Sequence, residues 1–309
     1  VDWALPYYRD RALAIGLGVP PVELFAGLLA RLSGHHSDAR QMPEHFSHKG
    51  LRIPVQSSVV GSQFLHAVGV AKGRPCGEVV YVSGGDGSTS QGDFHEALNY
   101  ACIHTLPVLF VIQDNGWAIS VTPQEQSAGG ETGAFAAYPG LARHTFDGCD
   151  VDETQSALDA AATRARNGEG PTLLIAKVLR LGAHSSSDDP KKYAAAEALD
   201  EQVLRDPIPR YQQWLLDHTL ATQEEIDALA EKVRADVEAA AAEADQLPHP
   251  DPATAGDNLF LPVSPTEQAV SPERGEAVVM MDALNHALAE EMERDERVVV
   301  FGQDVARGK

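Results

Sequence analysis

An aspartate stands between two glycines in the stretch Gly85-Asp86-Gly87, where a glycine-rich loop would normally come close to a phosphate group. A negative charge at this place repels a phosphate unless a cation lies between the two. Asn115 follows Gly87 after 27 intervening residues. Carboxylate and amide oxygens are ligands that suit Mg²⁺ or Ca²⁺. We therefore predict that Asp86 and Asn115 hold a divalent cation, and that this cation faces a diphosphate.

Two apolar runs with a helix between them would place Asp86 and Asn115 close together. The runs at 78–84 (EVVYVSG) and 106–113 (LPVLFVIQ) predict strands, and 92–103 predicts the intervening helix. Strands that are apolar on both faces are typical of a parallel sheet covered by helices. The carboxyl ends of such strands meet at one edge of the sheet, where ligands bind.

The same alternation of strands and helices continues on both sides of this unit. It predicts an α/β fold, with a doubly wound parallel sheet and helices on both faces. The further elements expected are helices at 20–34, 57–73 and 152–167 and a strand at 171–180.

The C-terminal part of the chain changes character. Thr222 and Glu225 form a capping-box pattern that starts a helix, whose apolar stripe runs through Ile226, Leu229, Ala230, Val233 and Val237. Six prolines between residues 247 and 272 disfavour regular structure and predict a linker. A helix from about Glu276 and a strand at 297–305 then predict the start of a second α/β unit. The expected division is 1–246, linker 247–273, and an incomplete 274–309.

Composition excludes several classes of protein. The formal net charge of -21 argues against a nucleic-acid partner, whose phosphates require a basic surface. No apolar run approaches the ~20 residues that span a bilayer, so no membrane association is expected. Cys76, Cys102 and Cys149 lack metal-binding or disulfide spacing, which favours a reducing cytoplasm.

Two readings from other classes compete with the cation-bridged site. One is an NAD-dependent oxidoreductase, but the loop "GDGSTS" lacks the third glycine of that fingerprint. The other is a non-catalytic subunit that has kept the fold. The pairing of Asp86 with Asn115 on the next strand argues against it.

The stretch "GDGSTSQGDFHEALNYACIHTLPVLFVIQDNGWAIS" resembles the thiamine diphosphate motif of 2-oxoacid dehydrogenase complexes, in particular the α subunit of their decarboxylating component. The resemblance implies thiamine diphosphate and Mg²⁺ as cofactors, with Asp86, Asn115 and the carbonyl of Trp117 as metal ligands. Asp114 departs from the first asparagine of the motif, and Gln113 stands where the family has a diphosphate-binding arginine.

Other segments resemble further parts of the same family. "YYRDRAL" implies diphosphate contacts, "SSVVGSQ" implies aminopyrimidine contacts, and "LRLGAHSSSDDPKKY" resembles the loop over the active site, which implies a catalytic His184 beside the cofactor phosphates. Arg180, four residues before His184, could equally form a strand-end salt bridge and is left out of the predicted site. The implied cofactor-binding residues are Tyr8, Arg9, Ser58, Val60, Gly85, Asp86, Gly87, Asn115 and His184.

The resemblance covers residues 1 to about 250, and 274–309 resemble the opening of the family's β subunit, with Gln303 in place of an acidic residue. We expect an interior part of an α–β fusion, or a chain that lacks both ends. The implied reaction is oxidative decarboxylation of a 2-oxo acid, with acyl transfer to a lipoyl-bearing acyltransferase component. The implied assembly is two-fold symmetric, with active sites between α-like and β-like parts. "ARQMPEHF" and "HSSSDDP" favour branched-chain 2-oxo acids over the alternative, pyruvate.

Overall fold

The computed structural model divides the chain into two compact units, Val1–Ala255 and Gly256–Lys309. The first unit contains every residue that the sequence singles out for chemistry, and it is the unit described most fully. The residues that the structure describes are 2–34, 38–45, 47–74, 77–134, 136–257, 259–260 and 277–302.

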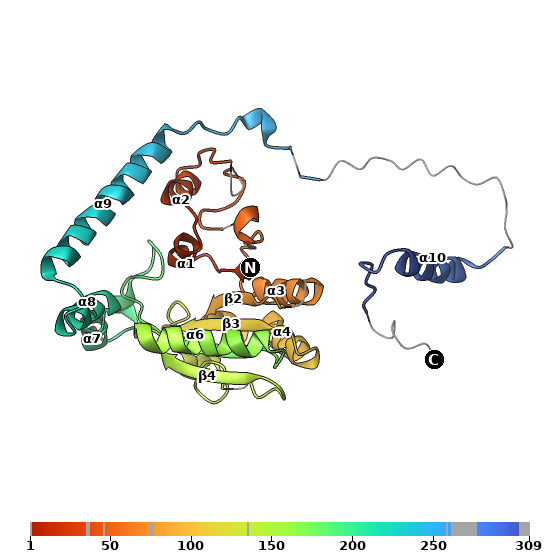
Figure 1. Ribbon diagram of the computed structural model, residues 1–309, viewed down its shortest axis with the longest axis horizontal. Coiled ribbons are helices and arrows are strands. Elements are labelled where there is room, and N and C mark those ends of the chain that lie inside the picture. Colours follow the sequence, from red (N-terminus) through yellow and green to blue (C-terminus); the bar gives the residue numbers. More distant parts are fainter. Residues whose placement is uncertain are drawn as a thin grey trace. The chain divides into compact units, whose positions relative to one another are not determined.

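A five-stranded parallel sheet forms the centre of the first unit, in the order β1-β2-β3-β5-β4 (Figure 1). The strands are β1 (Trp3–Leu5), β2 (Val80–Gly85), β3 (Val108–Asp114), β4 (Ala142–Asp147) and β5 (Thr172–Lys177). In the register of the sheet, Gly85 lies beside Gln113 and Asp114 lies beside Lys177. The predicted parallel α/β sheet is therefore confirmed.

Ten α-helices occur in the described part of the chain, and most of them surround the sheet. None of the helices there combines the length and the apolar character needed to cross a membrane. They are α1 (Arg11–Gly16), α2 (Pro21–Leu28), α3 (Ser62–Gly73), α4 (Gly92–Ile103), α5 (Pro123–Gln126), α6 (Val151–Arg166), α7 (Ala196–Leu204), α8 (Pro207–Asp217), α9 (Gln223–Gln246) and α10 (Met280–Arg294). Short 3-10 turns cover Lys49–Leu51, Asp86–Ser90, Pro190–Lys192 and Pro252–Thr254.

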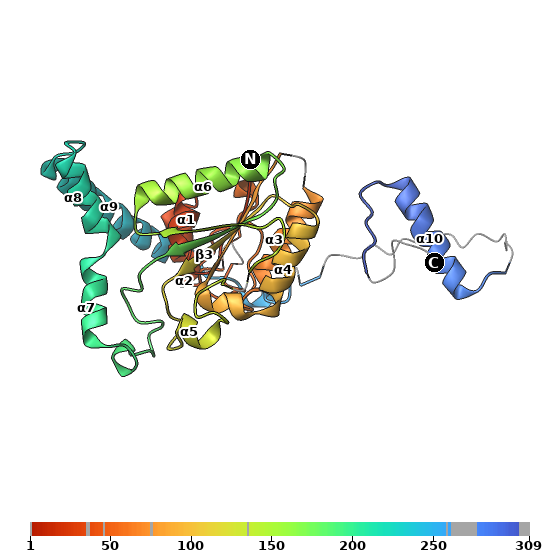
Figure 2. The same ribbon diagram turned by 90° about the horizontal axis from the view of Figure 1, so that it is seen from below.

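Helices cover both faces of the sheet, as Figures 1 and 2 show. On one face α3 and α4 pack their Phe64 and Phe94 rings, 4.8 Å apart between centroids, against the buried side of β2 and β3. On the other face the buried residues of α6 are alanines, such as Ala157 and Ala161, with the partly buried Leu158 beside them, and the alanines allow the helix to lie close to β3 and β5. A smaller core joins α1 and α2 to β1.

Two predicted helices are shorter than expected, for reasons that lie in the backbone. The helix expected at 57–73 begins only at Ser62, because its N-cap Gly61 has a left-handed φ of 89°. Residues 57–61 therefore stay outside the helix. The helix expected at 20–34 ends at Leu28, and Ala30 has a left-handed φ of 53° soon afterwards.

Two strands were not predicted from the sequence. β1 has only three residues, too few to show a pattern. β4, with the sequence ARHTFD, lies at the edge of the sheet and has only one buried residue, so it lacks the apolar run of a central strand.

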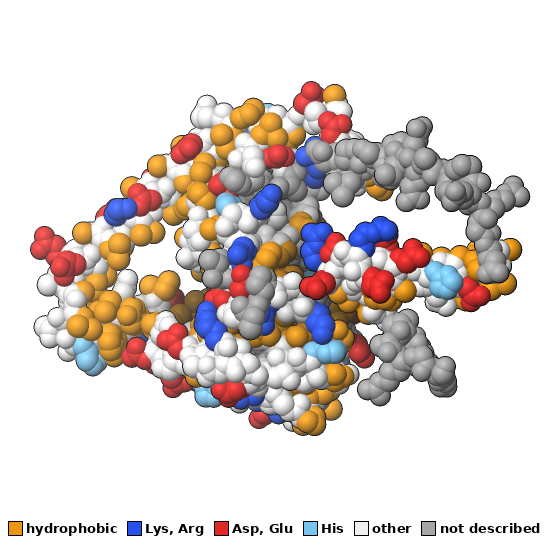
Figure 3. All heavy atoms as spheres, turned by 45° about the vertical axis from the view of Figure 1, so that its right-hand side comes forward, with side chains coloured by type: hydrophobic (Ala, Val, Ile, Leu, Met, Phe, Trp, Pro, Cys, Tyr) orange, Lys and Arg blue, Asp and Glu red, His pale blue; other side chains and the backbone are white. Residues whose placement is uncertain are grey.

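Helix α9 confirms the predicted capping box, and its apolar stripe is exposed. Thr222 and Glu225 form the predicted capping box, in which each side chain accepts a hydrogen bond from the other residue's backbone N–H. The apolar stripe, by contrast, faces solvent: Leu229, Val233 and Val237 are 44–62% exposed, and Figure 3 shows hydrophobic side chains along this arm. Contacts between α2 and α9 anchor the helix instead, together with an ion pair from Arg31 on the α2 side.

The second unit is described over a shorter range. Its helix, α10, begins at Met280 rather than near Glu276. The strand expected at 297–305 is not formed in its described portion, 297–302. Gln303 and Cys76 lie outside the described residues. The boundaries 1–246, 247–273 and 274–309, and the start of a second α/β unit, remain predictions.

Candidate cofactor site

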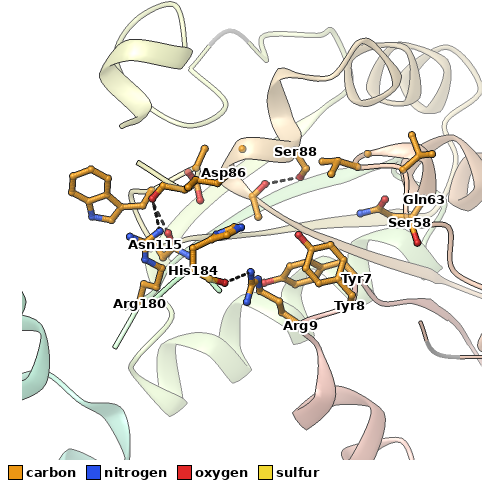
Figure 4. A pocket seen from close by; sticks show the side chains of 18 of the residues that line it. Tyr7, Tyr8, Arg9, Ser58, Gln63, Asp86, Ser88, Asn115, Arg180 and His184 are labelled. Atoms are coloured by element: carbon orange, nitrogen blue, oxygen red, sulfur yellow. Dashed lines mark hydrogen bonds between the residues drawn. The ribbon is translucent and has the colours of Figure 1, made fainter. Parts of the chain in front are cut away.

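A cavity of about 300 Å³ opens at the carboxyl edge of β2 and β3 (Figure 4). It lies where the doubly wound sheet is expected to bind ligands. The structure brings all the predicted site residues to this one cavity: Tyr8, Arg9, Ser58, Val60, Gly85, Asp86, Gly87, Asn115, Trp117 and His184.

Asp86 is a buried carboxylate at the floor of the cavity, with 1% of its surface exposed. Within the described part of the chain its hydrogen-bond donors are neutral groups, including Nε2 of Gln126 at 3.3 Å from Oδ2, and no lysine or arginine forms an ion pair with it. Burial, and then the negative charge of Asp114, raise the pKa of the Asp86 carboxyl to about 6. A buried carboxylate in this position favours a bound cation.

Asn115 and Trp117 belong to a tight turn that follows β3. The side-chain Oδ1 of Asn115 accepts a hydrogen bond from the backbone N–H of Trp117 at 3.0 Å. Oδ1 of Asp114 accepts one from the N–H of Gly116 at 2.9 Å, and its Oδ2 lies 2.5 Å from Nζ of Lys177. The two side chains thus hold the turn in one conformation, and a second lone pair on the Asn115 oxygen stays available.

The glycines of the loop differ in what they accommodate. A Cβ added to Gly84 would lie 2.7 Å from the Phe64 ring, and one added to Gly87 would lie 2.8 Å from Cβ of Ala118. These two glycines permit close packing. A Cβ on Gly85 would meet no atom within 4 Å, and Gly85 lines the cavity. Its missing side chain therefore leaves space for a ligand.

The segment between β1 and α1 is tied down by a buried polar cluster. Asp10 accepts hydrogen bonds from the Ser83 hydroxyl and from Nε2 of Gln113, and the Tyr7 hydroxyl donates to Oε1 of Gln113 at 3.2 Å. Burial raises the pKa of Asp10, and it raises that of Tyr7 as well. Gln113, at the position where the motif has an arginine, is not among the residues lining the cavity. Its hydrogen bonds hold the segment that carries Arg9 instead.

Ser58 is hydrogen-bonded to His45, a residue that was not predicted from the sequence to belong to the site. Its hydroxyl lies 2.7 Å from Nε2 of His45, and Nδ1 of His45 lies 3.0 Å from the carbonyl of Pro43. That carbonyl can only accept, so Nδ1 carries the proton and the Ser58 hydroxyl donates to Nε2. The His45 ring also stacks on Tyr8, with centroids 6.2 Å apart.

The loop after β5 lies against the cavity through backbone and side-chain contacts. Arg9 donates to the carbonyl of His184 at 2.8 Å, and the N–H of His184 donates to Asp188 at 2.8 Å. The Tyr193 hydroxyl also donates to Asp188, at 2.7 Å, and it accepts from Arg180. Burial, and then the charges of Arg9 and Arg180, lower the pKa of His184, which favours its neutral form.

Arg180 was not predicted to belong to the site, yet it lines the cavity. It donates to the carbonyl of Ile119 at 2.7 Å and lies 5.8 Å from the centroid of the Trp117 ring, so it joins the metal-side turn to the loop. Its place at the end of a predicted strand, four residues before His184, was the available signal. The other lining residues that the sequence reading did not assign are Tyr7, Ser57, Val59, Gly61, Gln63, Ser88, Ala118, Ile119 and Ala183.

The arrangement has the chemistry of a site for a metal-bound diphosphate. Asp86 and Asn115 offer oxygen ligands from neighbouring strands, and Gly85 leaves room beside them. Arg9 and Arg180 contribute positive charge to the same cavity, with Arg180 beside Asn115. Among the described residues, no group of three His, Cys, Asp or Glu side chains is placed to hold a metal ion, so the side-chain ligands on offer here are the oxygens of Asp86 and Asn115. The residues present therefore fit Mg²⁺ and a diphosphate.

The chain is similar to known proteins over most of its length. The profile of the family described as "Dehydrogenase E1 component" matches residues 1–253. The chain is 37% identical to the 2-oxoisovalerate dehydrogenase subunit alpha of Bacillus subtilis over 263 residues, which is 84% of this chain and 80% of that protein. It is 36% identical to the 3-methyl-2-oxobutanoate dehydrogenase subunit alpha of Mycobacterium tuberculosis over 247 residues, covering 76% of this chain and 63% of the relative.

A third relative is named for a different substrate, pyruvate. The pyruvate dehydrogenase E1 component subunit alpha of Staphylococcus aureus is 34% identical over 248 residues, covering 79% of this chain and 64% of the relative. The chain thus spans less than two thirds of the mycobacterial and staphylococcal proteins.

Proposed function

The chain belongs to the dehydrogenase E1 component family, and we propose that it is the α-type part of a thiamine diphosphate-dependent 2-oxoacid dehydrogenase. The reaction is the oxidative decarboxylation of a 2-oxo acid, with transfer of the acyl group to lipoyl groups of an acyltransferase component. The observation that carries the proposal is Asp86, a buried carboxylate without a cation partner among the described residues, which shares a cavity with Asn115.

In this proposal Mg²⁺ is held by Asp86, Asn115 and the backbone carbonyl of Trp117. The cation removes the repulsion between Asp86 and a diphosphate, and the space beside Gly85 admits a phosphate group. Arg9 supplies positive charge in the same cavity. Gly87, Tyr8 and the 57–61 segment with Ser58 and Val60 contact the rest of the cofactor.

When bound, thiamine diphosphate supplies the electron sink that allows carbon dioxide to leave a 2-oxo acid. The chain's own groups bind, orient and shield it. The hydroxyl of Ser58 keeps its lone pairs free for a ligand, because its proton is donated to His45. His184, largely neutral at pH 7 because its pKa is lowered, is available as a hydrogen-bonding group or proton carrier at Nδ1 or Nε2.

Branched-chain 2-oxo acids are the substrates we propose. The two relatives with the higher identities, 37% and 36%, are named for 2-oxoisovalerate and 3-methyl-2-oxobutanoate. The cavity wall also fits an aliphatic side chain, since Val59, Val60 and Ile119 line it and are 47–66% exposed. Pyruvate, for which the staphylococcal relative is named, carries only a methyl group and would contact less of this wall.

A β-like partner, from the same or another chain, is proposed to complete the active site in a two-fold assembly. The exposed apolar side chains at the cavity support this, because a partner would cover them. A cytoplasmic location is consistent with the free thiols of Cys102 and Cys149.

The test is calorimetric titration of thiamine diphosphate into the chain, first with MgCl₂ and then with EDTA. We expect magnesium-dependent binding in the wild type, its loss in Asp86→Asn, and wild-type binding in Asp200→Asn, an exposed carboxylate on α7. Turnover of 3-methyl-2-oxobutanoate and of pyruvate, measured with the β-like partner and an artificial electron acceptor, then separates the two substrates.

Each alternative gives its own result. Binding that persists in EDTA, or that survives Asp86→Asn, contradicts the metal site. Binding without turnover of either acid in the completed assembly would identify a non-catalytic subunit that has kept the fold. Faster turnover of pyruvate would reverse the choice of substrate.

A further inference from the structure

Asp114 is another buried carboxylate next to the cavity, and it forms an ion pair with Lys177. It is 2% exposed, and its Oδ2 lies 2.5 Å from Nζ of Lys177. The two residues are directly paired in the register of β3 and β5. Lys177 extends along the neighbouring strand, with 47% of its side chain exposed to solvent. An ion pair that holds one partner in the interior and the other at the surface therefore lies immediately before Asn115.

The other oxygen of Asp114 connects this pair to the metal-side turn. Oδ1 accepts the backbone N–H of Gly116 at 2.9 Å, and Gly116 has a left-handed φ of 77°. Asn115 and Trp117, the residues on either side, are linked by their own hydrogen bond of 3.0 Å. The position of Asp114 thus fixes the direction in which the two proposed ligands point.

Without Lys177 the Asp114 carboxylate would be a buried charge without a cation partner among the described residues. Such a charge is costly, and the chain relieves the cost by turning the carboxylate toward water. That rotation would break the bond to the N–H of Gly116 and would release the turn. The neutral asparagine of the family's motif would not need a lysine here, since an amide oxygen can accept the same N–H.

We propose that Lys177 is a positioning residue of the cofactor site: by pairing with Asp114 it holds the turn that carries Asn115 and Trp117 in the geometry that accepts Mg²⁺ and thiamine diphosphate. This inference rests on the function proposed above. It assigns a role at the site to a residue that does not line the cavity. It also explains how this chain accommodates aspartate where the motif has asparagine.

The experiment is a double-mutant cycle read by calorimetry, with thiamine diphosphate titrated into the chain at saturating MgCl₂. Lys177→Met is expected to weaken binding about tenfold, and Lys177→Arg, which keeps the charge, to weaken it much less. Asp114→Asn alone is expected to bind nearly as the wild type does, because the amide oxygen still accepts the N–H of Gly116. The double variant Asp114→Asn/Lys177→Met is expected to recover most of the lost affinity.

Two controls separate positioning from a general loss of structure. Lys232→Met removes a lysine from an exposed pair with Asp236, also 2.5 Å long, on α9. It should leave binding unchanged. Urea unfolding of each variant without cofactor should show that Lys177→Met remains folded under the conditions of the titration.

The outcomes distinguish this inference from the proposed function. If the wild type does not bind thiamine diphosphate with Mg²⁺, the proposed function fails. If the wild type binds and Lys177→Met binds equally well, the positioning role is refuted. A double variant that binds as weakly as Lys177→Met also overturns it, because Lys177 would then act independently of Asp114.

Discussion

Replacing the buried carboxylate Asp86 by asparagine should stabilise the protein in the absence of metal while it abolishes metal binding. Burial and the charge of Asp114 raise the pKa of Asp86 from 3.8 to about 6 in the folded protein. Asparagine has nearly the same shape and keeps an oxygen that can accept from Gln126. The change therefore removes an unfavourable charge with little change in packing.

The sign and size of the effect follow from proton linkage. Because the folded pKa lies above the unfolded one, the folded state binds more protons between about pH 4 and pH 6, and the free energy of unfolding falls as pH rises through that window. A difference of about 2 pKa units lowers the free energy of unfolding by about 3 kcal/mol at pH 8. At pH 4.5 the carboxyl of the folded protein is still mostly protonated, and the loss is only about 1 kcal/mol. Asp86→Asn should escape this loss, so its advantage over the wild type grows with pH.

Urea unfolding in EDTA at pH 4.5 and pH 8 measures this difference directly, with Asp200→Asn as the exposed control. Adding MgCl₂ and thiamine diphosphate at pH 8 should then stabilise the wild type and leave Asp86→Asn unaffected. A variant that is less stable than the wild type at pH 8, or an advantage that does not change with pH, would refute the account of Asp86 as an uncompensated buried charge.

Three further substitutions, one of them with a matched control, test other parts of the site. Gly85→Ala fills open cavity space, so calorimetry should show at least ~10-fold weaker binding of thiamine diphosphate, with an unchanged free energy of unfolding. The control Gly84→Ala clashes with the core instead, and urea unfolding should show that it loses about 1–3 kcal/mol of stability. Arg180→Gln releases Tyr193, and limited trypsin digestion should cut the 181–193 loop several times faster. His184→Gln keeps both backbone contacts of the loop; steady-state kinetics should show turnover reduced ~100-fold while cofactor affinity changes little.

The central strands of the fold were predictable because strands that are buried on both faces consist mostly of apolar residues. β2, β3 and β5 are buried on both faces and show as continuous apolar runs. The edge strand β4 has one side in solvent and a polar sequence, so only the finished sheet reveals it. The delayed start of α3 depends on a single left-handed glycine, Gly61, whose conformation the sequence does not reveal.

The site residues were found where a motif ties them to the carboxyl edge, and were not found where only tertiary contacts connect them. Asp86 and Asn115 follow strands, so the sheet brings them together. His45 reaches Ser58 from a loop whose path no local pattern predicts. The partner of Asp114 was equally hidden, because Lys177 becomes its neighbour only through the pairing of β3 with β5.

Both oxygen side chains proposed to bind the metal belong to one contiguous β2–α4–β3 unit, whose strands are adjacent and whose core includes Phe94 and Phe110. The cavity residues Arg9 and His184 come from distant parts of the chain, and the hydrogen bond that joins them is exposed. These two parts of the site should therefore differ in local unfolding. Amide hydrogens of β2 and β3 should exchange only on global opening, and those near residues 7–9 and 181–193 through small fluctuations. Cofactor binding should then slow exchange chiefly in these outlying segments, which report ligand occupancy while the strands report the stability of the whole fold.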